Sequence, residues 1–248
     1  CLDADLYENW TDVSGFLSAD PRIVQNPRAI GRITFDEMRE LSYMGASVLQ
    51  EEAIFPVREA NIPIQIKNTN RPEDTGTVIR ETADGDTNEH LITGIAGKKD
   101  FLAIHVKKAH MSNEVGVISR ALNIVERYGV SVEHIPTGVD SFGIVVNASD
   151  VKDTVYSIIS DIRREIEPDD ITMVDRLALV SVVGRNMSRR SGTSGKIFGA
   201  LGNAGVNIRM ITQSSEEISI IVGVDNADFD RTIGVIYNGF VRDEMVSR

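Results

Sequence analysis

The sequence has a single cysteine, no long apolar run and no excess of positive charge. Cys1 has no second cysteine to pair with, so the chain carries no sign of an oxidising compartment, and a reducing cytoplasm is the simplest location. No apolar run approaches the roughly 20 residues that a membrane-spanning helix needs. The 37 acidic and 26 basic residues give a formal net charge of -11, which argues against nucleic acid or an anionic membrane surface as a partner.

The composition is typical of a globular protein with more than one core. The chain has 248 residues, of which 42% are hydrophobic and 25% charged, and this length predicts two or three small domains. It begins Cys-Leu-Asp, without a methionine. We therefore expect the sequence to be a piece of a longer protein.

The first 79 residues alternate strand-like and helix-like stretches, which indicates an α/β layer. Thr34 and Glu37 have the spacing of a capping box, so a helix is predicted to begin there and to run to about Leu49. The polar, acidic run 80–89 has no apolar period and predicts a linker. The other elements expected in this part are a helix over residues 51–60 and strands over residues 62–66 and 77–79.

The remainder of the chain contains an internal repeat. The heptapeptides Gly-Val-Ser-Val-Glu-His-Ile (129–135) and Gly-Val-Asn-Ile-Arg-Met-Ile (205–211) match in their glycine and apolar positions. Each should follow a strand and a helix, with the first glycine as a left-handed helix stop, and each should precede an alternating strand and an amphipathic helix. The expected elements are residues 101–106, 117–128, 142–146 and 151–166 in the first copy, and residues 179–183, 195–203, 218–224 and 229–240 in the second.

Each copy therefore predicts a ferredoxin-like βαββαβ unit that needs one more strand to complete an antiparallel sheet of four strands. Residues 171–174 supply it in the first copy. The second copy has no such strand at its end, whereas an unassigned strand is expected over 91–95. Assigning that strand to the second unit makes the first unit an insertion within the second.

Several motifs identify a family when they are read together. They are Asn9-Trp-Thr-Asp-Val-Ser-Gly15, Ala19-Asp-Pro-Arg22, Glu40-Leu-Ser-Tyr-Met-Gly-Ala-Ser47, Ile92-Thr-Gly-Ile-Ala-Gly-Lys-Lys-Asp-Phe101 and Pro136-Thr-Gly-Val-Asp-Ser141. The chain resembles the C-terminal part of aspartate kinase, and the repeats resemble tandem ACT domains, which sense small molecules. The upstream elements of that family, which hold aspartate, are absent, so we expect this chain alone not to phosphorylate aspartate.

The resemblance implies a fold class and a division into domains. The fold is an α/β fragment of an amino-acid-kinase domain, followed by α+β structure with two ferredoxin-like ACT domains. The expected bounds are 1–82 for the kinase fragment, 83–90 for the linker, 97–175 for the first ACT domain, and 91–96 with 176–248 for the second.

The resemblance also implies an activity, its cofactors and its partners. These are ATP-dependent phosphorylation of the side-chain carboxylate of L-aspartate, with Mg²⁺ accompanying the nucleotide, and feedback control by lysine or threonine. The complete enzyme is expected to be cytoplasmic, and to form a homodimer or a larger assembly through the ACT domains. No resident metal site is expected.

A nucleotide pocket is implied near the first strand. The residues that the family match places there are Thr11, Asp12, Leu17, Arg22, Ser47 and Val48. The carboxyl end of a strand is where nucleotides bind in open α/β sheets, and the fork of an arginine suits phosphate oxygens. The chain departs from the family at Leu17, Ser47 and Gln50, where tyrosine, lysine and histidine are common. The main catalytic residues are expected upstream of this chain.

An effector site is predicted in the first repeat. An amino acid needs partners for both its carboxylate and its ammonium group; the backbone N–H groups at the start of a helix suit the first, and Glu133 suits the second. The expected residues are Gly116, Val117, Ile118, Ser131, Val132 and Glu133. Arg209 stands at the position of Glu133 in the second repeat and would repel an ammonium group, so the two repeats should differ in ligand binding.

Two other functions are alternatives to an aspartate kinase. A non-catalytic regulatory subunit that senses an amino acid would have no use for the nucleotide residues. An RNA-binding protein built on the same sheet conflicts with the acidic charge and the lack of surface aromatic residues. The glycines of Ser191-Gly-Thr-Ser-Gly-Lys196 do not have the spacing of a phosphate-binding P-loop.

Overall fold

The structure is a computed structural model that describes residues 4–46, 48–49, 51–82, 90–187, 190–213 and 216–242. The chain forms two compact units, one made of Cys1–Lys98 with Leu179–Arg248 and the other of Lys99–Ala178. The second unit is therefore inserted in the sequence of the first. The domain bounds predicted above divide the chain more finely and remain a prediction. Residues 83–89 of the predicted linker lie outside the described residues, and Arg80, where the polar run was expected to begin, is instead the last residue of a strand, Thr77–Arg80.

The larger unit begins with a sheet of four strands, β1 (Tyr7–Thr11), β2 (Arg32–Thr34), β3 (Ile64–Asn68) and β4 (Thr77–Arg80). Their order is β1-β3-β4-β2. β1 is parallel to β3 and β2 is parallel to β4, whereas β3 and β4 are antiparallel. Ile64, Ile66 and Ile79 have no exposed surface, so the two central strands carry the apolar core of this layer.

Helix α1 (Phe35–Tyr43) begins at the predicted capping box, because the Thr34 hydroxyl accepts from the Glu37 N–H while the Glu37 carboxylate accepts from the Thr34 N–H. It ends six residues before the predicted Leu49. The chain turns at Met44 and Gly45, and the left-handed φ of +102° at Gly45 is one that glycine adopts at little cost. Helix α2 (Glu51–Glu59) follows, close to its predicted bounds.

Two long strands contribute residues to both units: β5 (Gly94–Lys107) and β7 (Asp170–Val183). The expectation of separate strands at 91–95 and 101–106, and at 171–174 and 179–183, is therefore wrong. The residues between the expected strands, 96–100 in β5 and 175–178 in β7, continue the strand. Each stretch has one residue in the left-handed region, Asp100 at φ 67° and Arg176 at φ 53°. A single left-handed residue is a common way for a strand to continue past an irregularity.

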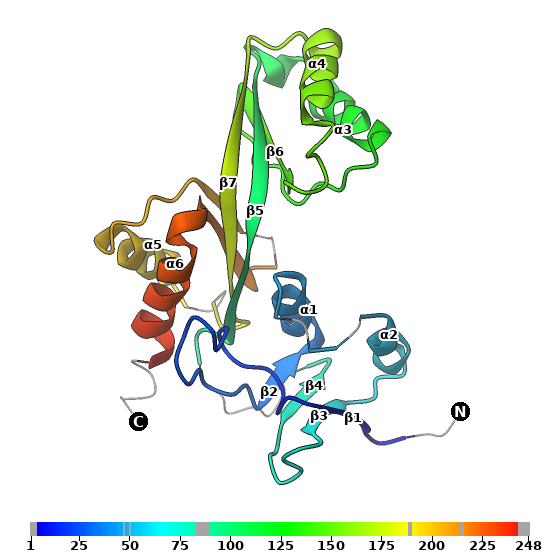
Figure 1. The fold of residues 1–248 in the computed structure, drawn as a ribbon, viewed down its shortest axis with the longest axis vertical. Coiled ribbons are helices and arrows are strands. Elements are labelled where there is room, and N and C mark those ends of the chain that lie inside the picture. Colours follow the sequence, from blue (N-terminus) through cyan, green and yellow to red (C-terminus); the bar gives the residue numbers. More distant parts are fainter. Residues whose placement is uncertain are drawn as a thin grey trace. The chain divides into compact units, whose positions relative to one another are not determined.

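In the unit 99–178, helices α3 (Val117–Arg127) and α4 (Val155–Ile166) lie side by side against β5, β6 (Ser141–Asn147) and β7 (Figure 1). Helix α3 turns one face toward this core. Val117, Ala121, Ile124 and Val125 are buried, whereas Ile118 and Tyr128 are half-buried at the edge of the same core. Four residues before α4 form turns, so this helix starts at Val155 and not at 151.

The second repeat lies in the larger unit and has α5 (Thr193–Asn203), β8 (Met210–Gln213), β9 (Ser219–Asp225) and α6 (Phe229–Ile236), with the ends of β5 and β7. A π-helical segment, Tyr237–Arg242, continues α6. The two repeats agree closely. Gly116 and Gly192 cap α3 and α5 with φ of 83° and 85°, and Gly129 and Gly205 follow these helices with φ of 68° and 71°.

Candidate functional site

A cavity of about 320 Å³ lies within the larger unit, beside the loop that follows β1. Three of the predicted nucleotide residues, Leu17, Arg22 and Val48, line it. This volume falls at the small end of the range for small-molecule sites, and the lining is mainly apolar with one charged pair. Such a lining suits a flat base on the inside and phosphate groups at the mouth.

Thr11 and Asp12 stand at the carboxyl end of β1, as predicted, but do not line this cavity, whereas their neighbour Val13 does. The Thr11 hydroxyl donates to the Asp12 carboxylate at 3.2 Å, and the backbone N–H of Thr69 donates to the Thr11 carbonyl at 2.8 Å. These bonds hold the strand end, while Asp12 itself is exposed. Ser47 and Gln50 lie outside the described residues.

Arg22 forms an ion pair with Asp20 at the cavity mouth. Its Nε lies 3.0 Å from Oδ1 and its Nη2 lies 2.6 Å from Oδ2. Hydrogen bonding to Arg22 lowers the pKa of Asp20, and the same bond raises the pKa of Arg22. The arginine side chain is 87% exposed, and a guanidinium has five N–H donors, so donors remain that can meet phosphate oxygens.

The far wall of the cavity comes from the second repeat. Ile95, Ala96 and Gly97 of β5 line it together with Phe229 and Ile233 of α6. A Cβ on Gly97 would lie 2.5 Å from the Leu179 carbonyl oxygen and 2.7 Å from the Phe229 ring, so only glycine fits there. Sequence reasoning missed this wall, because about 210 residues separate Leu17 from Phe229 in the chain and no local pattern links them.

A groove of about 700 Å³ lies in the unit 99–178, and the predicted effector residues Ser131, Val132 and Glu133 line it. Its other side is the outer face of α3, at Leu122, Asn123 and Glu126. This face of α3 was not among the predicted effector residues, although the helical spacing of Leu122 and Glu126 was a usable signal.

The other predicted effector residues, Gly116, Val117 and Ile118, do not line this groove. They form the start of α3, where Gly116 is the N-cap and Val117 is buried. Arg120 donates to the Val115 carbonyl oxygen and pairs with Glu114, and Lys108 lies 3.2 Å from the same glutamate. Hydrogen bonding from Lys108 lowers the pKa of Glu114. The effector placement therefore remains a prediction, carried by the 131–133 segment.

The matching position in the second repeat, Arg209, has the same backbone hydrogen bond. The N–H of Glu133 donates to the Val145 carbonyl oxygen at 2.8 Å. The N–H of Arg209 donates to the Gly223 carbonyl oxygen at 2.7 Å. A separate cavity of about 410 Å³ lies at the start of α5, and Arg190, Gly192 and Thr193 are among its lining residues.

Among the residues that the structure describes, no group of three or more His, Cys, Asp or Glu side chains is arranged to hold a metal ion. In the same described part of the chain, no helix combines the length and the apolar character needed to cross a membrane.

Comparison with known proteins gives two family matches. Residues 1–68 match the amino acid kinase family, and residues 180–240 match the ACT domain family. Among curated relatives, aspartokinase 3 of Bacillus subtilis is 39% identical over 99% of this chain and 54% of its own length. Aspartokinase 1 of Arabidopsis thaliana is 29% identical over 93% of this chain and 41% of its own length. The chain spans about half the length of the curated relatives that it matches.

Solved structures agree. Aspartate kinase of Clostridium acetobutylicum is 52% identical, with a TM-score of 0.92 over 96% of this chain and 55% of that one. A structure of aspartokinase α and β subunits is 30% identical, with a TM-score of 0.54 over 60% of this chain and 97% of that one. The predicted fold, an amino-acid-kinase fragment followed by ACT domains, is thereby confirmed. This chain belongs to the aspartokinase family.

Proposed function

We propose that this chain is the nucleotide-binding and regulatory part of an aspartate kinase, which transfers a phosphoryl group from ATP to the side-chain carboxylate of L-aspartate. The observation that carries the proposal is the 52% identity to the Clostridium acetobutylicum enzyme over 96% of this chain. The family resemblance puts the groups that hold aspartate upstream of the motifs found here, so we place them in the part of the relatives' length that this chain does not span.

In this reaction the chain must position the nucleotide and offset the negative charge of its phosphate groups. An oxygen of the aspartate carboxylate attacks the γ-phosphorus, and the bond to the leaving ADP oxygen breaks. Phosphoryl transfer depends on placement and on nearby cations more than on covalent help from the protein. The apolar cavity around Leu17 and Val48 would hold the base, and Arg22 would meet phosphate oxygens at its mouth. Mg²⁺, bound with the nucleotide, would add positive charge, and the exposed carboxylate of Asp12 would face it.

Feedback control forms part of the same proposal. An amino acid would occupy the groove lined by Ser131, Val132 and Glu133, with its ammonium group on the glutamate. Lysine is the first ligand to test and threonine the second. Aspartokinase III of Escherichia coli, which at 24% identity shares the fold, has been solved with lysine and aspartate.

We also propose that the complete enzyme is cytoplasmic and associates through its ACT sheets. β8 ends its sheet in the larger unit, and Ile211 on it is 50% exposed, which is the kind of edge that another copy can cover. Light scattering at micromolar concentration tests this, and a monomeric mass would contradict it.

The alternative is a non-catalytic regulatory subunit. It draws support from the aspartokinase α and β subunit structure, which matches 60% of this chain. The cavity between residues 13–48 and the second repeat favours the kinase, because a sensor has no need of it.

The deciding experiment measures ADP release with ATP and aspartate, by the complete enzyme and by this chain alone. The complete enzyme should release ADP only when aspartate is present, and this chain should not release it. In the complete enzyme Asp12→Ala should depress turnover strongly without loss of fold, because an exposed carboxylate contributes little to packing. Aspartate-dependent ADP release by this chain, or no ADP release by the complete enzyme, would contradict the proposal.

A further inference from the structure

Glu37, in the first turn of α1, is a carboxylate with no exposed surface. Burying a charged group is costly unless it is paired and hydrogen-bonded. A capping box needs only one bond from the glutamate to the N-cap, and an exposed glutamate would make it equally well. The full burial of this side chain therefore calls for an explanation beyond capping.

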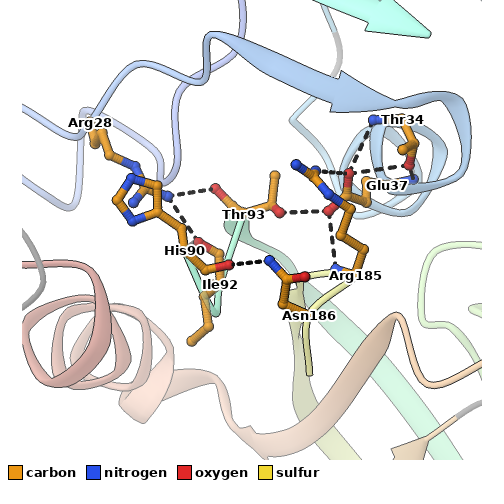
Figure 2. Close-up of polar contacts among 8 residues, drawn as sticks. All are labelled: Arg28, Thr34, Glu37, His90, Ile92, Thr93, Arg185 and Asn186. Carbon is orange, nitrogen blue, oxygen red and sulfur yellow. Dashed lines mark hydrogen bonds and ion pairs between the residues drawn. The ribbon is translucent and has the colours of Figure 1, made fainter. Parts of the chain in front are cut away.

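The partners of Glu37 come from three segments (Figure 2). The Thr34 N–H donates to its Oε2 at 3.0 Å, and the Thr93 hydroxyl donates to its Oε1 at 2.6 Å. Arg185 donates twice, from its N–H to Oε1 at 3.1 Å and from Nη1 to Oε2 at 2.8 Å. Both carboxylate oxygens are thus held by donors that are themselves fixed in place. Burial raises the pKa of Glu37, but the bonds from Thr93 and Thr34 and the charge of Arg185 outweigh it, so the pKa is lowered.

Two of these partners belong to the second repeat. Thr93 directly precedes β5, and Arg185 follows β7 by two residues. The Thr93 N–H donates to the Val183 carbonyl oxygen at 2.8 Å, which joins the two segments to each other. They also touch closely at Gly184, where a Cβ would lie 2.3 Å from the Leu91 carbonyl oxygen. Glu37 therefore binds one closely packed junction of β5 and β7, formed by residues 91–93 and 183–185.

The other end of α1 leads into the nucleotide cavity. Met44, Gly45, Ala46 and Val48, which follow this helix, all line the cavity. The Ala46 N–H donates to the Leu41 carbonyl oxygen at 3.0 Å, so this turn is fixed to the helix. The β5 residues Ile95–Gly97, just after Thr93, line the opposite wall. A shift of the helix relative to β5 at Glu37 would change the distance between the two walls.

A second set of bonds holds the remaining wall to the same strand. The Ile95 N–H donates to the Ser18 carbonyl oxygen at 2.8 Å, and Arg28 Nη2 donates to the Ile92 carbonyl oxygen at 2.9 Å (Figure 2). The loop that carries Leu17 and Arg22 is therefore also fixed to the start of β5. The α1 wall is joined to the start of β5 by the buried Glu37 carboxylate and by apolar packing, in which Leu41 lies close to Gly94.

We propose that Glu37 is a positioning residue, through which the junction of β5 and β7 sets the place of α1 and so the width of the nucleotide cavity. Because β5 and β7 continue in sequence into the unit with the predicted effector groove, Glu37 would also carry effector inhibition to the nucleotide. This inference rests on the proposed function, and it identifies Glu37 as one residue through which that function is regulated.

The competing explanation is that Glu37 only stabilises the fold. Both explanations predict a less stable protein when it is changed, so stability cannot separate them. A purely structural role would leave the KM for ATP and the response to inhibitor unchanged in the protein that does fold. A positioning role would shift both and leave kcat nearly unchanged, because the residue touches no reacting atom.

The test uses the complete enzyme with three variants. Glu37→Gln removes the charge and keeps the shape, and Thr93→Val removes one donor at nearly constant volume. Asp36→Asn is the matched control, since Asp36 is the neighbouring, exposed carboxylate of α1 and pairs with Arg58 at 2.8 Å. We expect the first two to change the KM for ATP and the inhibitor concentration for half inhibition by roughly fivefold or more, while the control stays at the parent values.

Normal KM and normal inhibition in folded Glu37→Gln and Thr93→Val would overturn the inference. Should Glu37→Gln fail to fold, the milder Thr93→Val decides alone. An equal shift in Asp36→Asn would also overturn it, because the effect would then belong to α1 as a whole. Absence of aspartate-dependent ADP release from the parent enzyme would instead contradict the proposed function, and calorimetric titration of this chain with ATP would then test the cavity by itself.

Discussion

Glu133 and Arg209 occupy the same position in two copies of one structural repeat. Each lies four residues after a left-handed glycine, and each donates its backbone N–H to the fifth residue of the neighbouring strand, Val145 or Gly223. Equivalent backbones thus present opposite charges. A ligand with an ammonium group is attracted at one position and repelled at the other.

The first prediction follows from this opposition. In the complete enzyme Glu133→Gln should weaken binding of the inhibitory amino acid by roughly tenfold or more, as expected from about 1.5 to 3 kcal/mol for a hydrogen bond to a charged group. Uninhibited turnover should stay nearly unchanged. Arg209→Gln is the matched control and should alter binding much less. Calorimetry with lysine and with threonine measures both, and unchanged affinity in Glu133→Gln would place the effector elsewhere.

The second prediction concerns Arg22. Arg22→Lys should raise the KM for ATP several-fold in the complete enzyme, because lysine cannot reproduce the planar fork that meets two phosphate oxygens. The thermal stability of the protein should hardly change, since the ion pair with Asp20 is exposed and such pairs contribute little. Steady-state kinetics at varied ATP, together with a melting curve, provide both values. A lower Tm with a normal KM would mean that Arg22 serves the loop and not the nucleotide.

The third prediction concerns the tight contact of Gly97 with Phe229. Gly97→Ala should destabilise the chain by about 1 to 3 kcal/mol, because the new methyl group would overlap the ring and the Leu179 carbonyl oxygen. Gly199→Ala is the control. Gly199 lies in α5 with open space around it. Alanine there should raise the free energy of unfolding by about 0.5 to 1 kcal/mol, because alanine favours the helix more than glycine does. Urea unfolding of this chain measures both, and equal effects of the two changes would contradict the packing argument.

Local signals predicted the local structure well. The capping box at Thr34 and the left-handed stop at Gly129 both involve residues only a few positions apart, so a short stretch of sequence contains all the groups that interact. The repeat was also detectable, because its glycines are needed for backbone conformations that other residues adopt with difficulty.

Tertiary relationships could not be predicted in the same way. Whether Asp100 breaks a strand or takes a left-handed φ within it depends on the strands beside it, so the length of β5 was underestimated. Phe229 adds a wall to the cavity lined by Leu17, and Glu37 is buried beside Arg185; both contacts join distant parts of the chain. The family resemblance identified which residues to examine, and the structure added their partners.

The last prediction concerns acid stability and Glu37. The pKa of this carboxyl is lowered in the folded chain, so the folded state binds its proton less readily than the unfolded state does. Its contribution to stability is therefore fully present above the ordinary carboxyl pKa of 4.5 and is lost as the pH falls through the lowered folded value. Glutamine at this position does not titrate, so the Glu37→Gln variant lacks this particular loss.

At pH 7 the parent chain should be more stable than Glu37→Gln by roughly 3 kcal/mol or more, since the change removes the charged partner from a buried ion pair. As the pH is lowered below 4.5, that difference should shrink, because only the parent loses a charged interaction at Glu37. Urea unfolding of both proteins at intervals between pH 7 and pH 3 provides the two curves. A difference that stays constant over this range would show that the buried carboxylate is not held in its charged form by Thr93, Thr34 and Arg185.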